Sequence, residues 1–149
     1  LTLLFLGGTP SSRLEEIRAG ASEVVQVAST CCLQLDKIAF WEDIAWLGSS
    51  AFVPELDRLV DALKWQMQKV KVGYHEMPFV PHITLARKAS AEVELPDFHA
   101  LQWQVGQMAL MTSREGEAGL EYDIIEAWDL PSSKQSEANM FVTDVSVSR

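Results

Sequence analysis

The residues best suited to chemistry lie in the segment Pro81-His82-Ile83-Thr84-Leu85. Side chains two positions apart on a β-strand point to the same side, so His82 and Thr84 share one face of a predicted strand. A histidine can move a proton near neutral pH, and a threonine hydroxyl can donate a hydrogen bond to a phosphate oxygen. The pair therefore indicates phosphate chemistry. The alternative is a structural histidine, because a lone His-x-Thr pattern is also compatible with that role.

The basic residues of the chain gather around this segment. The 149 residues carry a formal net charge of −9, which argues against broad, non-specific binding of nucleic acid. Between Arg58 and Lys88, however, six basic residues stand against two acidic ones, whereas residues 89–131 hold nine acidic residues and one Arg. We therefore expect an anionic ligand to bind near His82. The alternative is that the lysines form an ordinary solvated helix face.

Composition excludes several other classes of protein. No apolar run reaches the roughly 18 residues that a membrane span needs, so no membrane partner is expected. The two cysteines, Cys31 and Cys32, are adjacent, which excludes a disulfide scaffold and favours a reducing compartment such as the cytoplasm. The three histidines and two cysteines lack the spacing of a metal site. We expect no metal, no other cofactor and a monomeric chain.

Hydrophobic periodicity predicts an α+β fold with antiparallel strands against helices. One helix is expected from about residue 13 to 28, opened by a capping box of Ser12 and Glu15, and another from Pro54 to Gly73. The predicted strands cover residues 1–6, 32–36, 44–47, 82–86, 103–111 and 120–128. Residues 1–131 are assigned to one domain with two lobes, and residues 132–149 to a polar linker and a candidate strand.

Two segments resemble the motifs of a known superfamily. Residues 1–7, Leu-Thr-Leu-Leu-Phe-Leu-Gly, resemble all but the first residue of His-Leu-Thr-Leu-Leu-Phe-Leu-Gly, the first catalytic motif of the two-histidine phosphoesterases. Residues 79–87, Phe-Val-Pro-His-Ile-Thr-Leu-Ala-Arg, resemble the second motif. The chain looks most like the RNA 2′,3′-cyclic phosphodiesterases, historically called 2′-5′ RNA ligases. Residues 44–48, 103–113 and 119–122 are also similar to that family.

The resemblance implies a bilobal fold with two-fold pseudosymmetry, in which two antiparallel sheets line a central cleft and helices lie outside. It also implies metal-independent opening of an RNA 2′,3′-cyclic phosphate to a 2′-phosphate, with one histidine as base and the other as acid. The ligand is then an RNA with such an end or a small cyclic nucleotide. His82 is expected to be one of the two catalytic histidines, and the hydroxyls of Thr2 and Thr84 to bind the phosphate.

Further residues receive weaker assignments. Phe79 and Arg87 are candidate substrate contacts, through stacking on a base and through binding of an anion. The alternatives are core packing for Phe79, a surface salt bridge for Arg87 and a solvent-facing strand position for Thr2. Arg87 lies three residues beyond Thr84 and thus on the opposite face of an ideal strand. The residues expected to be buried behind the two threonines are Leu1, Leu3, Ile83 and Leu85.

The sequence departs from the family pattern at its ends. The family's first histidine stands immediately before the residue matched by Leu1, so we expect more chain upstream. Residues 139–147 resemble the family's first strand, which a circular permutation would return to its place; an unrelated tail is the alternative. Two further functions stay open. They are a non-catalytic RNA- or nucleotide-binding module of the same fold, and a phosphoesterase acting on another cyclic or 2′-5′-linked nucleotide.

Overall fold

The computed structural model describes residues 1–90, 97–116 and 119–132. It contains antiparallel strands and two α-helices, which confirms the predicted α+β class. In chain order the elements are η1 (Ser11–Arg13), α1 (Leu14–Val27), β1 (Cys31–Leu35), β2 (Lys37–Trp41), β3 (Ile44–Gly48), α2 (Pro54–Lys69), β4 (His82–Arg87), β5 (Leu101–Val105), β6 (Gln107–Gly116) and β7 (Gly119–Asp129).

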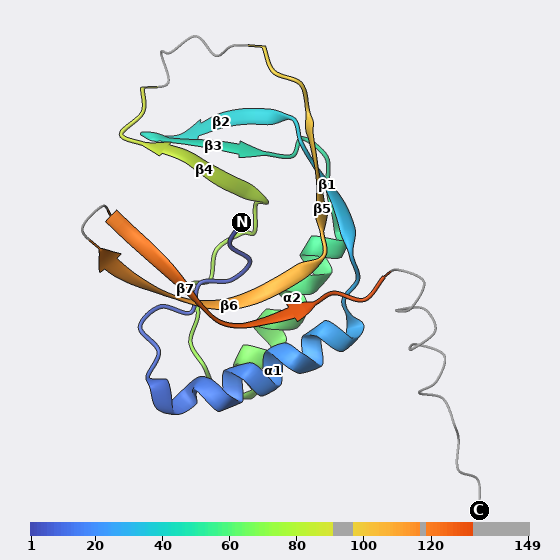
Figure 1. Ribbon diagram of the computed structural model, residues 1–149, viewed down its shortest axis with the longest axis vertical. Helices are drawn as coiled ribbons and strands as arrows, with labels where there is room; N and C mark the ends of the chain where they lie inside the picture. The colour runs from blue at the N-terminus through green and yellow to red at the C-terminus, as the bar shows by residue number, and fades with distance from the viewer. Residues whose placement is uncertain (91–96, 117–118, 133–149) are drawn as a thin grey trace, which may run out of the picture.

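The described strands form three small antiparallel sheets. One sheet has the order β2-β3-β4, and the other two are the pairs β1-β5 and β6-β7. Figure 1 shows the β2–β4 sheet across from the β6-β7 pair, with β1 and β5 running along one side between them. Because Gly106 alone separates β5 from β6, one stretch of chain passes from the β1-β5 pair into the β6-β7 pair.

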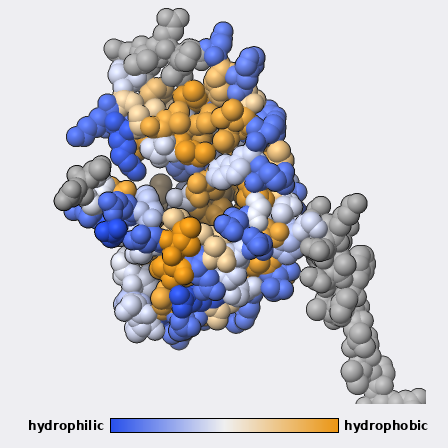
Figure 2. All heavy atoms as spheres, viewed as in Figure 1, coloured by the Kyte–Doolittle hydropathy of each residue, from blue (hydrophilic) through white to orange (hydrophobic). Residues whose placement is uncertain are grey.

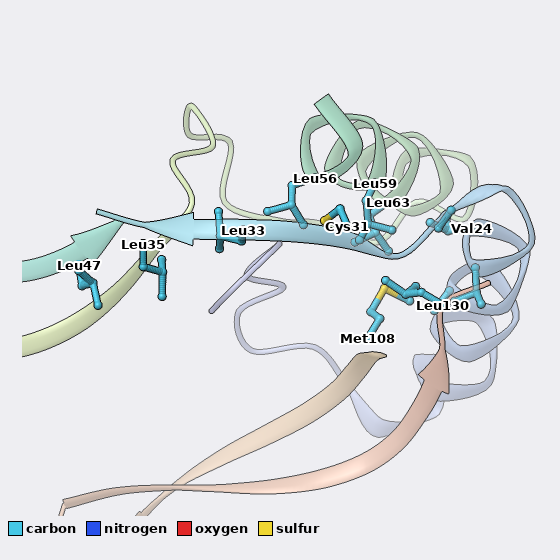
Figure 3. Close-up of a cluster of buried hydrophobic side chains, with 13 residues drawn as sticks. Val24, Cys31, Leu33, Leu35, Leu47, Leu56, Leu59, Leu63, Met108 and Leu130 are labelled. Atoms are coloured by element: carbon cyan, nitrogen blue, oxygen red, sulfur yellow. The ribbon is translucent and has the colours of Figure 1, made fainter. Parts of the chain in front are cut away.

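The core lies where the helices meet β1. Helix α1 packs against β7 and α2 packs against α1, and Figure 3 shows the leucines of α2 next to β1. Strand β1 alternates between buried and exposed positions, as an amphipathic strand must, so Cys31 is buried and Cys32 exposed. Burial raises the pKa of the Cys31 thiol. The buried members of this main core cluster are Ala21, Val24, Val25, Ala28, Cys31, Leu33, Leu35, Leu47, Leu56, Leu59, Leu63, Met108 and Leu130.

The two helices begin differently. Helix α2 begins at Pro54, as expected, because proline in the first turn loses no hydrogen bond there. The capping box expected at Ser12 is wrong: Ser12 lies inside the short helix η1, and α1 begins after Arg13 without a side-chain cap. Instead, Arg13 forms a salt bridge with Glu16 at 2.7 Å in the first turn of α1.

The strand expected over residues 1–6 is absent from the described structure. A strand needs a neighbouring chain for its peptide groups, whereas this segment receives a hydrogen bond from the His75 N–H to the Phe5 carbonyl at 2.9 Å. Leu1 is 37% exposed and Phe5 53% exposed, although Leu3 and Leu4 pack against the main core cluster.

Two further differences concern strand boundaries. The strand expected over residues 103–111 is two strands, because Gly106 divides β5, which pairs with β1, from β6, which pairs with β7. No strand was expected from the sequence over residues 37–41, since the turn that joins β2 to β3 contains Glu42 and Asp43 rather than Asn-Gly. Glu42 nevertheless adopts the left-handed conformation that this turn requires, with φ 52°.

The last two expectations concern the C-terminal segment and membrane insertion. The candidate strand over residues 139–147 lies outside the described residues. Within the described part of the chain, no helix is both long enough and apolar enough to cross a membrane.

We predict that Leu33→Ala destabilises the protein by about 2–5 kcal/mol, because the side chain is 0% exposed and its removal leaves a cavity. Leu101→Ala is the matched control, since Leu101 is also a strand leucine but is 55% exposed. Its cost should stay below about 1 kcal/mol. Urea unfolding measures both free energies, and equal losses in the two variants contradict the described core.

Gly48 supports a second prediction, because a Cβ atom there would lie 2.7 Å from both the Pro81 carbonyl oxygen and the ring of Trp46. We expect Gly48→Ala to destabilise the protein by about 1–3 kcal/mol. Gly106→Ala is the control, since no atom lies within 4 Å of its Cβ position. Thermal unfolding compares the two variants, and a neutral Gly48→Ala shows that β3 and β4 do not meet as described.

Candidate active site

His82 stands at the start of β4, directly after the loop that contains Pro78 and Pro81. Its Nδ1 lies 2.7 Å from the carbonyl oxygen of Val80. Because a carbonyl can only accept a hydrogen bond, we assign the proton of the neutral ring to Nδ1. Nε2 then has no proton and is the atom able to exchange one with a ligand.

Two tryptophans hold the imidazole ring. The ring of Trp41 meets it edge-on, with centroids 4.6 Å apart, and the ring of Trp46 lies 6.2 Å away. The two indoles stack on each other at 4.6 Å. Trp46 is 6% exposed and forms the base of this cluster, whereas Trp41 is 39% exposed at its rim.

Strand pairing places His82 and Thr84 on one face, as expected. His82 is opposite Gly48 and Thr84 is opposite Trp46, while Ile83 is opposite Leu47. Residues directly opposite each other share a face of the sheet. His82, Thr84 and Trp46 therefore lie on one side, and Ile83 and Leu47 lie against the main core cluster on the other.

An irregularity in β4 changes the position of Arg87. The pairing shifts between Ala45 and Trp46, so Leu85 has no partner and Arg87 is opposite Ile44. Strand β3 pairs regularly with β2, so Ile44 points to the same side as Trp46. Arg87 thus returns to the face that carries Thr84. The expectation that it lies on the opposite face is wrong, because a bulge interrupts the alternation of an ideal strand.

The same irregularity accounts for part of the burial pattern behind the threonines. Leu85 is 51% exposed, because the unpaired position of a bulge is not held to either face. Leu1 is exposed as well, because no strand carries it. Leu3 and Ile83 are partly buried against the main core cluster, as expected. The expected burial is therefore wrong for Leu1 and Leu85.

Thr2 and Phe79 lie outside the helices and strands. Thr2 is exposed in the segment before η1. Leu3 and Ile83, which follow Thr2 and His82, pack against the same cluster. Phe79 also packs against that cluster and is partly buried, so much of its ring surface is occupied by the core.

Strand β2 adds two residues that the sequence reasoning missed. Lys37 is opposite Gly48 and therefore in one row with His82. Its Nζ lies 5.8 Å from the ring centroid of Trp46. Trp41 is the other. Because the turn after β2 lacks glycine and asparagine, the available signal was the aromatic and β-branched content of residues 37–41.

The charge on this face is positive. Lys37 and Arg87 are exposed, and among the described residues neither forms an ion pair with a carboxylate. The described residues also contain no group of three or more His, Cys, Asp or Glu able to hold a metal ion. The face can therefore attract an anion and exchange a proton with it.

The surface of the molecule is hollowed between its two parts. Figure 2 shows a hollow between the part of the molecule that carries β2–β4 and the part that carries β6 and β7, with apolar residues gathered over β2–β4. A separate pocket of about 310 Å³ near the start of α1 includes Arg13 and Lys71 in its lining but none of the predicted site residues.

Known sequences similar to this chain are phosphodiesterases. No family model matches the chain. The RNA 2′,3′-cyclic phosphodiesterase of Escherichia coli (strain K12) is 29% identical over 134 residues, which cover 87% of this chain and 74% of that protein. The protein of the same name from Thermus thermophilus is 28% identical over 141 residues, which cover 87% of this chain and 71% of that protein.

Solved structures that are similar to this chain in fold also include phosphoesterases. The crystal structure of E. coli LigT complexed with 3′-AMP has a TM-score of 0.78 and 27% identity, covering 87% of this chain and 75% of that one. A crystal structure described as a phosphoesterase has a TM-score of 0.78 and 26% identity, covering 88% of this chain and 76% of that one. The crystal structure of TT0787 from T. thermophilus has a TM-score of 0.76 and 25% identity, covering 89% of this chain and 78% of that one.

The two comparisons use different features of the molecule, since one compares residues and the other compares backbone positions. The names of the relatives support a phosphoesterase function at the level of the family. Agreement in both sequence and fold confirms that this chain resembles the RNA 2′,3′-cyclic phosphodiesterases, the LigT-like family of the two-histidine phosphoesterases.

Proposed function

We propose that this protein hydrolyses RNA 2′,3′-cyclic phosphate ends to 2′-phosphates, with residues 1–131 as one phosphoesterase domain. The observation that carries the proposal is the placement of His82: its ring is fixed by Val80 and two indoles, and it shares a face with Thr84 and Arg87. The relatives supply the substrate class, because they are named for this activity and LigT has been crystallised with 3′-AMP.

Hydrolysis requires two proton transfers. A general base takes a proton from water, the water oxygen bonds to phosphorus, and the bond from phosphorus to the 3′ oxygen breaks. A general acid then protonates that departing oxygen, which leaves a 2′-phosphate. His82 carries one of these transfers through Nε2, because its Nδ1 proton is held by the Val80 carbonyl. The second histidine is the one that the family places before the residue matched by Leu1.

The phosphate is held by groups on the same face. The Thr84 hydroxyl donates to a non-bridging oxygen, and the guanidinium of Arg87 offsets the negative charge that builds up during attack. Lys37 adds charge at the other end of the row that contains His82. Thr2 donates from the N-terminal segment. With two imidazoles for the protons and cations for the charge, the reaction requires no metal ion.

His82→Ala tests the proton-transfer role. We expect turnover of a 2′,3′-cyclic phosphate to fall by roughly 10²–10⁴-fold, because the group that exchanges the proton is removed. Unfolding temperature should change little, since the His82 ring is not part of the core. An initial-rate assay measures the loss.

The control for this variant is His99→Ala, because His99 is an exposed histidine of the loop before β5. It should retain full activity. EDTA should leave the wild-type rate unchanged. Full activity of His82→Ala contradicts the assignment, and loss of wild-type activity in EDTA contradicts metal-independent hydrolysis. Nucleotide binding without turnover favours the non-catalytic module instead.

Thr84→Val and Arg87→Met test the phosphate contacts. Thr84→Val should weaken binding of the 2′-phosphate product by about 0.5–3 kcal/mol, because a charged acceptor loses a neutral donor. Arg87→Met should weaken it by a similar or larger amount and reduce its dependence on salt. Arg58→Met is the control, since Arg58 lies exposed on α2 beside Glu55. Isothermal titration gives the affinities, and an unaffected Arg87→Met places its side chain outside the site.

A further inference from the structure

Trp41 is a large aromatic side chain left partly open to solvent beside the proposed catalytic ring. It is 39% exposed, although it stacks on Trp46 and touches His82. The three centroid distances of 4.6, 4.6 and 6.2 Å form a triangle with nearly a right angle at Trp41. Trp46 stacks on the Trp41 indole at an interplanar angle of 30°, and His82 meets the indole from another direction at an angle of 78°.

Part of the indole surface remains open to solvent, since Trp41 is 39% exposed. Among the described residues, Trp46 and His82 are the aromatic partners of Trp41, the first stacked on it and the second nearly perpendicular to it. In the strand pairing, Trp41, Ile44 and Arg87 form one row across the sheet. An exposed aromatic face thus lies on the same side as an exposed cation and a proton-transfer group.

We propose that Trp41 is a stacking platform for the nucleobase of the substrate. The inference rests on the proposed function and goes beyond it, because it assigns to β2 the part of the substrate that does not react. A base and a cyclic phosphate are attached to the same ribose, so a phosphate held at His82 brings its own base next to the neighbouring indole. Stacking requires only a flat π-face, so the site should accept all four bases.

The plainer role for Trp41 is to position the His82 ring. The two roles differ in what the substrate must contain. A positioning residue affects every substrate that reacts at His82, whereas a stacking residue affects only substrates that carry a base. The discriminating pair is therefore adenosine 2′,3′-cyclic phosphate and 1-O-methylribose 2′,3′-cyclic phosphate, which is the same cyclic ester without a base.

Trp41→Leu is the test variant, with kinetics on both substrates. We expect KM for the adenosine compound to rise about tenfold or more, because base stacking on an aromatic side chain contributes to binding of the nucleotide. Any change in kcat that follows from losing the contact between Trp41 and His82 should be the same on the two substrates. KM for the base-free compound should stay within about twofold of the wild type. Trp41→Phe should restore most of the affinity, since phenylalanine keeps a π-face.

Trp65→Leu is the matched control, because Trp65 is 68% exposed on α2 and belongs to no described ring cluster. It should leave both substrates unaffected. A rise in KM of similar size on both substrates for Trp41→Leu, or a fall in kcat on both without a selective rise in KM for the adenosine compound, overturns the stacking role and leaves Trp41 as a positioning residue. Unchanged kinetics on the adenosine compound overturn it as well.

Binding measurements separate this proposal from the proposed reaction. Isothermal titration with adenosine 2′-monophosphate and with 1-O-methylribose 2-phosphate needs no turnover. A wild-type preference for the nucleotide that Trp41→Leu abolishes supports the platform even where no cyclic phosphate is hydrolysed. Equal wild-type affinity for the two compounds overturns the platform, whether or not the hydrolytic activity is present.

Discussion

The antiparallel pairing of β3 with β4 is the constraint on which the site depends. Its register places His82 and Thr84 opposite Gly48 and Trp46, and the shift at Ala45 leaves Leu85 unpaired. A bulge reverses the faces of the residues that follow it. For this reason Arg87 joins the histidine and threonine on one side, and a single displaced residue determines which side chains share that face.

The floor of the site depends on the same pairing. Because Gly48 has no side chain, the ring of Trp46 can lie over it, close to the Pro81 carbonyl. The buried indole in turn supports Trp41, and both rings lie beside the imidazole. On the reverse side, Leu47 and Ile83 join the main core cluster. One face of the three-stranded sheet thus packs in the core, and the other face carries His82.

An acidic protein can still bind an anion at a face whose own charged side chains are cations. The net charge of −9 opposes contact with many phosphates of a long RNA. Lys37 and Arg87 lie on the face of the β2–β4 sheet that carries His82. This distribution fits recognition of one terminal phosphate and its nucleotide, with the attraction limited to the hollow between the two parts of the molecule.

The sequence by itself determined the features that depend on local periodicity. The helical spacing of apolar residues placed α1 and α2 within a few residues, Pro54 marked the start of α2, and the motif containing His82 and Thr84 identified β4 and its exposed face. These features follow from the chain's own geometry, because 3.6-residue and two-residue repeats need no knowledge of neighbours.

Only the tertiary structure decided the rest. The side on which Arg87 lies depends on a shift in pairing with β3, and the roles of Lys37 and Trp41 depend on β2, whose turn at Glu42 carries no recognisable signal. Residues 1–6 are apolar enough for a strand but lack a ladder of hydrogen bonds in the described structure. The physical reason is common to all three: the partner of a strand can lie far away in the sequence, and that partner determines whether the strand forms and where its side chains point.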